Sequence, residues 1–296
     1  MLGEILTAIA TPFRDDGSVD LDAFARLAAH LVDSGSDGLV VAGTTGEAPT
    51  LSDTEKLALF TAAVETVGGR ATVVANTGSN DTAHSVHLTR EAHEVGVDGF
   101  LVVTPYYNKP PPRGIVGHFE AIADVTDRPI VVYNIPQRVV VNIEPETMAR
   151  LAEIAPVAAV KQATTDPAQA RFIVEETGLT LYAGNDDLVQ PFLELGGAGG
   201  ICVYTHLVGP RVKEQVARFR AGDVDGARAI DAELRPVMDA LSVTTNPIPL
   251  KAALAMAGQD LGGLRLPLVE ASEDEKARIR AGLEQAGVLT TSAAVG

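Results

Sequence analysis

One lysine of this sequence stands at the end of a strongly apolar segment. Lys161 follows residues 157–160, which read Val-Ala-Ala-Val, so it is expected to be the last residue of a buried strand. Burying an ammonium group is costly unless the group is paired, and burial favours the neutral amine of a lysine. A neutral amine can attack a ketone to form a Schiff base. Lys161 is therefore the candidate nucleophile, and the alternative is a lysine that extends from the rim to solvent.

Phenol groups also follow apolar segments. The chain has five tyrosines and no tryptophan, and each tyrosine lies in or directly after such a segment: Tyr106, Tyr107, Tyr133, Tyr182 and Tyr204. Buried phenols need hydrogen-bond partners, and several phenols and threonine hydroxyls in one pocket can pass protons along a chain. These tyrosines are candidates for proton transfer, or else they only pack the end of the fold.

Two further segments could bind carboxylates. Residues 43–46 read Gly-Thr-Thr-Gly, and they offer backbone donors together with the hydroxyls of Thr44 and Thr45. No basic residue follows, so the turn suits a carboxylate better than a diphosphate. Arg138 lies a few residues after Tyr133 and could hold a second carboxylate with two hydrogen bonds. A plain turn and a solvated arginine are the alternatives.

Residues at the ends of the last two apolar segments are weaker candidates. Gly184 and Cys202 are included as substrate-binding residues, although Cys202 is most simply a buried apolar residue. Asp186 and Asp187 could cap the helix that follows, with metal binding as a minor option. Because Cys202 is the only cysteine, an internal disulfide and a cysteine-based zinc site are excluded.

Metal and phosphate sites find little support elsewhere. His84, His87 and His93 lie on a charged and polar helical stretch, which fits a solvent-facing surface better than a metal site. The glycine-rich residues 196–200 precede the last strand instead of following it, so they are expected to form a tight turn away from any ligand. We therefore expect neither a metal nor another cofactor.

Eight apolar, β-branched segments alternate with amphipathic stretches. The expected strands are residues 5–10, 38–42, 72–76, 99–103, 130–133, 157–161, 179–183 and 200–203. Eight such βα units predict a (β/α)8 TIM barrel, an α/β fold whose active site lies where the strands end. A doubly wound sheet is the competing architecture, but the first strand is followed by Thr11-Pro12-Phe13 and not by a glycine-rich turn.

The remaining sequence predicts a C-terminal helical extension. Helical patterns cover residues 223–241, 247–257 and 272–286 without another strand. We expect the barrel to occupy residues 1–222 and the extension residues 223–296, with a frayed tail from residue 290 onward.

Composition restricts partners and location. The 296-residue chain has a formal net charge of -16 and a pI near 4.7. Both a nucleic acid and an anionic membrane surface would repel it. The apolar start of the chain lacks a basic segment and carries Glu4, which predicts a strand and not a signal peptide. We expect a cytoplasmic enzyme acting on small molecules.

The motifs at the strand ends together resemble the dihydrodipicolinate synthase family, also called the 4-hydroxy-tetrahydrodipicolinate synthase family. They are Gly-Thr-Thr-Gly-Glu at 43–47, Thr-Pro-Tyr-Tyr-Asn-Lys-Pro at 104–110, Tyr-Asn-Ile-Pro at 133–136 with Arg138, and Lys161. The resemblance extends nearly end to end, through Thr-Gly-Ser-Asn at 77–80, Asn-Pro-Ile-Pro-Leu-Lys at 246–251 and Leu-Pro-Leu at 266–268.

The resemblance implies a reaction and roles for these residues. Lys161 would condense with pyruvate, with Thr44 and Thr45 holding its carboxylate, in lysine and diaminopimelate biosynthesis. Tyr133, Thr44 and Tyr107 would relay protons, and Arg138 would bind the carboxylate of L-aspartate 4-semialdehyde. The family implies no cofactor beyond the covalent Schiff base. It also implies that Tyr107 reaches into a neighbouring subunit's site and that the enzyme is a homotetramer.

This sequence departs from the family pattern at several positions. Residues 139–141 read Val-Val-Val, and Gln162 follows Lys161 where glutamate is frequent, but neither change removes a catalytic group. Lysine-inhibited members carry histidines and a glutamate where this chain has Asp53, Lys56 and His84. Because the cation of Lys56 would repel a lysine ligand, we expect weak or absent feedback, although Asn80 and Tyr106 are retained.

Two other functions stay open. Related aldolases that act on 2-keto-3-deoxy sugar acids or on N-acetylneuraminate share the pyruvate half-reaction and differ in the acceptor. Arg138 and the loop at 104–110 favour a short carboxylated aldehyde over a polyol. The second alternative, a catalytically silent pyruvate-binding barrel, is disfavoured by the joint presence of Lys161, Tyr133, Thr44 and Tyr107.

Overall fold

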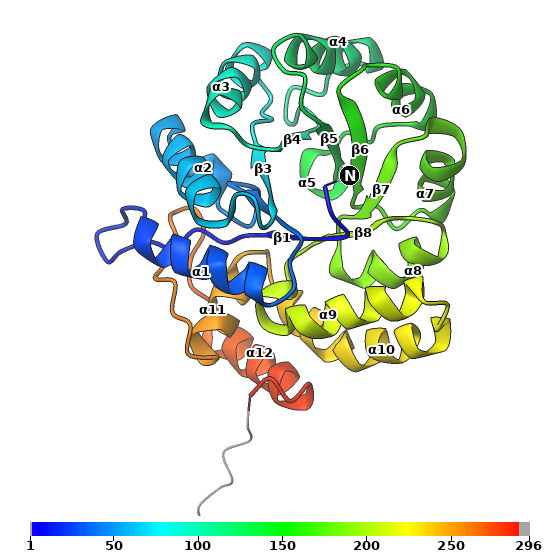
Figure 1. Ribbon diagram of the computed structural model, residues 1–296. Coiled ribbons are helices and arrows are strands. Elements are labelled where there is room, and N and C mark those ends of the chain that lie inside the picture. Colours follow the sequence, from blue (N-terminus) through cyan, green and yellow to red (C-terminus); the bar gives the residue numbers. More distant parts are fainter. Residues whose placement is uncertain (1, 290–296) are drawn as a thin grey trace, which may run out of the picture.

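The computed structural model describes residues 2–289 and contains a closed barrel of eight parallel strands (Figure 1). The strands are β1 (Ile5–Ala8), β2 (Gly38–Val41), β3 (Thr72–Asn76), β4 (Gly99–Val103), β5 (Ile130–Asn134), β6 (Val157–Gln162), β7 (Thr180–Ala183) and β8 (Gly199–Cys202). Pairing between β1 and β8 closes the barrel, with Ile5 opposite Gly200. The predicted TIM barrel is confirmed.

The strands are buried on both faces, because side chains fill the barrel and helices cover its outside. Each predicted strand forms, with its ends within two residues of the expected positions. Glycine is needed where β8 meets the start of β1. Gly199 has a φ of 153°, and a Cβ there would lie 2.0 Å from the Glu4 carbonyl oxygen. The predicted glycine turn thus also serves the closure of the barrel.

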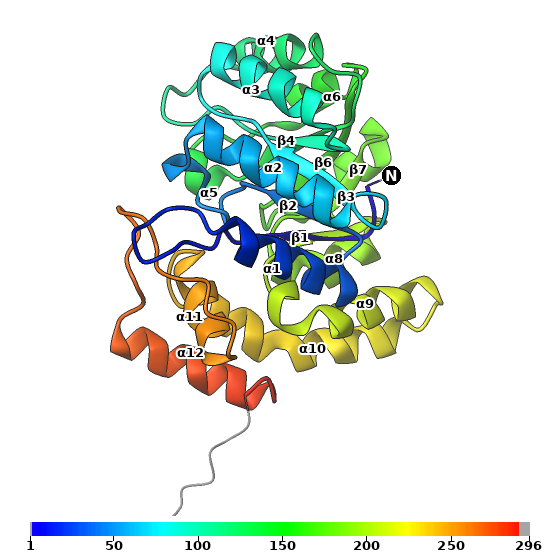
Figure 2. The same ribbon diagram turned by 60° about the vertical axis from the view of Figure 1, so that its left-hand side comes forward.

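A ring of helices surrounds the strands (Figures 1 and 2). They are α1 (Leu21–Asp33), α2 (Asp53–Val67), α3 (Thr82–Val95), α4 (Pro112–Ala123), α5 (Pro136–Val139), α6 (Pro145–Ala152), α7 (Pro167–Phe172), α8 (Val189–Glu194) and α9 (Thr205–Arg220). Short helical turns are η1 (Ala48–Thr50), η2 (Ile173–Thr177) and η3 (Asp186–Leu188). Side chains cap several helices: Ser52 and Glu55 form a capping box on α2, and Asp81 accepts from the first turn of α3.

Three more helices follow the barrel: α10 (Val224–Leu241), α11 (Ile248–Met256) and α12 (Glu273–Gln285). They lie together outside the ring, and α10 packs against α9, α11 and α12 (Figure 2). Their bounds differ from the predicted ones by at most a single residue at either end. The tail expected to fray, residues 290–296, lies outside the described residues. Among residues 2–289 no helix combines the length and apolar character that a membrane span requires.

Candidate active site

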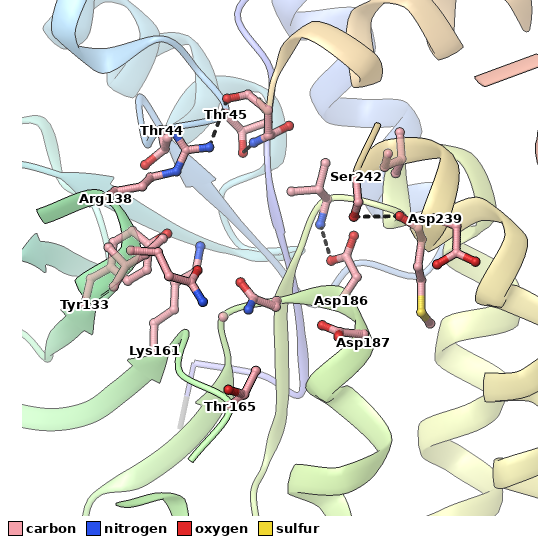
Figure 3. A pocket seen from close by; sticks show the side chains of 18 of the residues that line it. Thr44, Thr45, Tyr133, Arg138, Lys161, Thr165, Asp186, Asp187, Asp239 and Ser242 are labelled. Carbon is pink, nitrogen blue, oxygen red and sulfur yellow. Dashed lines mark hydrogen bonds between the residues drawn. The ribbon is translucent and has the colours of Figure 1, made fainter. Parts of the chain in front are cut away.

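A cavity of about 430 Å³ opens at the carboxyl ends of the strands (Figure 3). Most of the residues singled out in the sequence line it: Thr44, Thr45, Tyr133, Arg138, Lys161 and Gly184. They come from the ends of β2, β5, β6 and β7, of which β5, β6 and β7 are neighbours in the barrel while β2 is separated from β5 by β3 and β4. The parallel topology brings these side chains into one place, as the sequence predicted.

Lys161 lies in β6 and is 5% exposed. Its Nζ lies 4.4 Å from the ring centroid of Tyr133, which pairs with Lys161 across β5 and β6. The face of a phenol attracts an ammonium by only about 0.5–2 kcal/mol, much less than a buried carboxylate would. The side chain is therefore enclosed, points into the cavity and does not extend to solvent. The amine therefore lies where a ketone bound in the cavity could reach it.

The turn after β2 presents hydrogen-bond donors to the same cavity. Within residues 2–289, the N–H groups of Thr44 and Thr45 donate no backbone hydrogen bond. The Thr45 hydroxyl accepts a hydrogen bond of 2.9 Å from Asn246 Nδ2, so its own proton is free to donate. These groups form a compact set of donors for an anionic oxygen, and the turn is more than a simple connection.

Arg138 stands on the short helix α5, and its side chain points toward Thr44 and Thr45 (Figure 3). The side chain is exposed at its outer side, and Nη2 donates to the backbone oxygen of Asn246 at 3.3 Å. This leaves other guanidinium donors available to a ligand. The cavity thus carries a guanidinium and two threonine hydroxyls, which are groups that bind carboxylates.

Gly184 and Asp186 shape the side of the cavity next to Lys161. A Cβ at Gly184 would lie 2.8 Å from the Cβ of Ala163, so a larger residue would press on the end of β6. Asp186 does not cap the following helix, contrary to one expectation. Its carboxylate accepts from the N–H groups of Val203 and Tyr204 at 2.8 and 2.9 Å. Burial of this carboxyl group raises its pKa to about 6.

His206 holds the other side of the Val203 peptide. Its Nδ1 donates to the Val203 carbonyl oxygen at 2.8 Å, and its Nε2 accepts from the Ala10 N–H at 3.2 Å. Acceptance at Nε2 requires the neutral ring with its proton on Nδ1, and burial lowers the pKa of His206 to about 4. Val203 lines the cavity, so one neutral histidine and one carboxylate fix the backbone there.

Acid should therefore destabilise the protein through His206. Its pKa of about 4 in the folded state lies below the ordinary 6.5, so the folded state binds fewer protons between these values. The stabilisation is complete above pH 6.5 and is lost as the pH falls toward 4, with a total of about 3 kcal/mol at about 1.4 kcal/mol per pKa unit. We expect urea unfolding of a His206→Gln variant to show a flatter loss of stability between pH 7 and 5.

Two comparisons isolate this effect. The raised pKa of Asp186 favours the folded state in acid, and the wild-type slope is therefore a sum of opposing contributions. Subtracting the slope of the variant from the slope of the wild type removes the contribution of Asp186, which both proteins share. Replacement of the exposed His87 by glutamine should leave the slope unchanged. Equal slopes in wild type and His206→Gln would contradict the assignment of a neutral histidine.

Three predicted participants lie elsewhere. Cys202 is fully buried in the hydrophobic core and is not among the residues that line the cavity, and its role in binding substrate stays a prediction. Tyr182 donates to the Gly3 carbonyl oxygen at the opposite end of the barrel, and Tyr204 is fully buried. Tyr182 packs in the hydrophobic cluster inside the barrel, whereas Cys202 and Tyr204 pack in the larger cluster that the strands share with the surrounding helices.

Tyr107 takes a different position from Tyr133. It is 88% exposed, adopts a φ of 69°, and is not among the residues that line the cavity of its own chain. A non-glycine residue in this conformation is strained and requires support from its surroundings. An exposed aromatic ring held in this way fits a contact with another subunit better than a role in the site of its own chain.

A second cavity of about 620 Å³ lies on the other side of Thr44, Tyr133 and Arg138. It contains the positions discussed for regulation: Asp53, Lys56, Asn80, His84 and Tyr106. Asp53 accepts from His84 Nε2 at 2.9 Å and lies 3.5 Å from Lys56 Nζ. His84 therefore has a carboxylate partner, and no group of three metal-binding side chains occurs among residues 2–289.

Several lining residues were not identified as site residues from the sequence. They belong to α10 of the helical extension and to the segment that follows this helix: Arg235, Met238, Asp239, Ser242 and Asn246. Most carry no local signal, because they belong to an ordinary amphipathic helix. Asn246 had one, since it begins the Asn-Pro-Ile-Pro-Leu-Lys motif. The extension thus forms the outer wall of the cavity.

Comparisons with known proteins agree with this site. The model of the dihydrodipicolinate synthetase family matches residues 1–286. The 4-hydroxy-tetrahydrodipicolinate synthase of Moorella thermoacetica is 50% identical over 97% of this chain and 99% of its own. The lysine-bound enzyme of Cyanidioschyzon merolae superposes with a TM-score of 0.95 at 40% identity, covering 97% and 99% of the two chains. The chloride-inhibited, pyruvate-complexed synthase of Acinetobacter baumannii gives 0.94 at 33%, covering 98% and 100%. This chain belongs to the dihydrodipicolinate synthetase family.

Proposed function

We propose that this protein is a 4-hydroxy-tetrahydrodipicolinate synthase, a lyase of lysine and diaminopimelate biosynthesis that condenses pyruvate with L-aspartate 4-semialdehyde. The observation that carries the proposal is the enclosed Lys161 in a cavity that is also lined by Thr44, Thr45 and Arg138, which can bind carboxylates. The names of the curated relatives support the same activity, and one related structure contains pyruvate.

Pyruvate enters first in this proposal. The amine of Lys161 attacks the ketone carbon, water leaves, and a protonated imine forms. The N–H groups and hydroxyls of Thr44 and Thr45 bind the carboxylate and orient the ketone toward Nζ. A methyl proton then passes to the relay of Tyr133 and Thr44, and the electron pair of the broken C–H bond moves to the cationic imine, which gives an enamine. The covalent bond to Lys161 supplies the electron sink, and the reaction needs no cofactor.

The aldehyde is attacked next. The enamine carbon bonds to the aldehyde carbon, and the aldehyde oxygen takes a proton from the phenol of Tyr133. Arg138 binds the carboxylate of the semialdehyde at the mouth of the cavity. Attack of the substrate's amino group on the imine carbon closes the ring and releases Lys161. Tyr133 lies against Lys161, and can serve both proton transfers without moving.

Assembly and location belong to the proposal as well. We place Tyr107 in the active site of a neighbouring subunit, where its phenol would join the relay of Tyr133 and Thr44. Its exposure and constrained backbone support this placement. The protein would then be a homotetramer made of two such dimers in the cytoplasm, and an isolated subunit would be poorly active.

Pyruvate consumption with a panel of aldehydes tests the proposal. L-aspartate 4-semialdehyde is compared with N-acetylmannosamine, glyceraldehyde and glyoxylate at equal concentrations. Strong preference for the semialdehyde supports the synthase. Preference for another aldehyde would reassign the protein to the related aldolases, and absence of turnover with every aldehyde would favour the silent barrel.

Lysine should inhibit this enzyme weakly. The second cavity contains Lys56, and a lysine ligand would bring another ammonium close to it. Asp53 already interacts with Lys56 and His84, so little of its charge is left for a ligand. We expect less than half inhibition at about 1 mM lysine, an affinity of about -4 kcal/mol or weaker. A Lys56→His variant should be more sensitive. Half inhibition of the wild type well below about 1 mM would contradict this prediction.

A further inference from the structure

Glu47 ends the turn that carries Thr44 and Thr45, and it is unusual in two respects. Its side chain is fully buried, with 0% exposure, and its backbone adopts a left-handed φ of 58°. Glutamate is rarely buried without a partner, and a non-glycine residue with positive φ is strained. The surrounding structure must therefore hold Glu47 firmly in this conformation.

The partner of Glu47 comes from the helical extension. Lys251 in α11 is 5% exposed, and its Nζ lies 2.9 Å from Glu47 Oε1. Lys251 Nζ also donates to the Gly263 carbonyl oxygen at 2.6 Å and lies 4.3 Å from the ring centroid of Phe13. Burial lowers the pKa of Lys251, while Glu47 favours its charged form. The ammonium thus has a full set of partners below the protein surface.

Arg265 adds a second connection to the same turn. Its backbone N–H donates to Glu47 Oε2 at 3.0 Å, and its Nη1 donates to the Thr50 carbonyl oxygen at 2.7 Å. The guanidinium also pairs with Glu55 and lies 4.5 Å from the ring centroid of Phe13. Both carboxylate oxygens of Glu47 are therefore engaged by groups from the part of the chain that follows the barrel.

This network lies directly beneath the donors for pyruvate. The Glu47 N–H donates to the Thr44 carbonyl oxygen at 3.1 Å and closes the turn. On the other side, the Thr11 hydroxyl donates to the Gly46 carbonyl oxygen at 2.7 Å. Asn246, five residues before Lys251, donates to the Thr45 hydroxyl. The position of Thr44 and Thr45 thus depends on contacts from the extension as well as on the barrel.

We infer that the buried Glu47–Lys251 ion pair is a positioning pair, through which the helical extension holds the Thr44–Thr45 turn in the geometry that binds the pyruvate carboxylate. The inference rests on the proposed function, because it assigns that carboxylate to the turn. Neither residue lines the cavity that contains Lys161, so neither touches the substrate. Removing one charge leaves the other buried and unpaired, and the turn can satisfy it only by shifting.

Three variants test the inference: Lys251→Met, Glu47→Gln, and the two combined. Each is incubated with increasing pyruvate and borohydride, and the fraction of protein carrying the adduct is read from its intact mass. Lys251→Met should raise the half-saturating pyruvate concentration about tenfold or more, while saturating pyruvate still gives full labelling. KM for the semialdehyde should change less than about threefold, because Arg138 binds it elsewhere.

The double variant separates positioning from general damage. With both charges removed, the amide oxygen of the introduced glutamine can still accept from the Arg265 N–H, so the half-saturating concentration should return to within about threefold of wild type. Lys213→Met is the matched control, because it breaks the pair between Lys213 and Asp37 near the other end of the barrel. This control should lower the melting temperature without altering the response to pyruvate.

Each outcome decides a separate point. Unchanged half-saturation in a folded Lys251→Met would overturn the inference and leave the proposed function standing. The same shift in Lys213→Met would also overturn it, because destabilisation alone would then explain the effect. If Lys251→Met does not fold, Glu47→Gln and the double variant give the same comparison. A wild type that pyruvate and borohydride do not label would refute the proposed function, and the inference with it.

Discussion

Replacing Lys161 with alanine is expected to lower kcat/KM by about 10⁴-fold or more, because the covalent intermediate can no longer form. The protein should remain folded. Among residues 2–289 the Lys161 side chain forms no hydrogen bond or ion pair and contacts the face of Tyr133, so its removal breaks few interactions. Pyruvate consumption with the semialdehyde measures the loss, and the borohydride adduct should vanish from the intact mass.

Lys56→Ala is the matched control for this experiment. Lys56 is 9% exposed and lines the neighbouring cavity, so it resembles Lys161 in burial but lies outside the proposed chemistry. This variant should keep both the adduct and most of the activity. An adduct that persists in Lys161→Ala, or one that disappears in Lys56→Ala, would show that another amine is the nucleophile.

Tyr133→Phe should lower kcat by about 10²–10³-fold, because it removes a proton donor and leaves the ring in place. The phenylalanine keeps the face that lies 4.4 Å from Lys161 Nζ, so pyruvate should still be trapped on Lys161. The defect should appear in later proton transfers. Exchange of the pyruvate methyl protons with deuterated water, followed by NMR, should slow by a similar factor. KM for pyruvate should change little.

Tyr182→Phe provides the comparison for the loss of a phenol. Tyr182 is also buried, but its hydroxyl donates to the Gly3 carbonyl oxygen at 2.7 Å, away from Lys161. This change should cost about 1 kcal/mol of folding stability and leave kcat intact. If both variants lost activity equally, Tyr133 would have no special role in proton transfer. If neither variant lost activity, a group other than Tyr133 would transfer the proton.

The barrel could be predicted because its signals are local and repeated. Each buried strand is a short apolar segment, such as residues 157–160, and each helix shows its own period, so no long-range information is needed to find them. Parallel topology then places every strand end at one rim. That rule alone was enough to bring Lys161, Tyr133, Thr44 and Arg138 into one expected site, and the structure gathers all four around one cavity.

The depth at which a strand side chain lies within the barrel could not be predicted in the same way. Tyr133 and Tyr182 both follow apolar segments, yet one faces the cavity and the other reaches the opposite end. Which end a strand residue reaches depends on the stagger of neighbouring strands, and local sequence does not encode it. Cys202 has a different reason: it lies at a strand end but packs in the cluster that the strands share with the helices, while its neighbour Ile201 packs inside the barrel.

The sequence by itself predicted the fold class, the candidate nucleophile and the residues at the strand ends, since these predictions follow from period, apolar character and residue type. Only the tertiary structure decided which tyrosine meets Lys161, which atoms hold Val203, and that Glu47 pairs with Lys251. These contacts join residues far apart in the chain. Their energies depend on distance and burial after the barrel and the extension have packed together, which no local pattern reports.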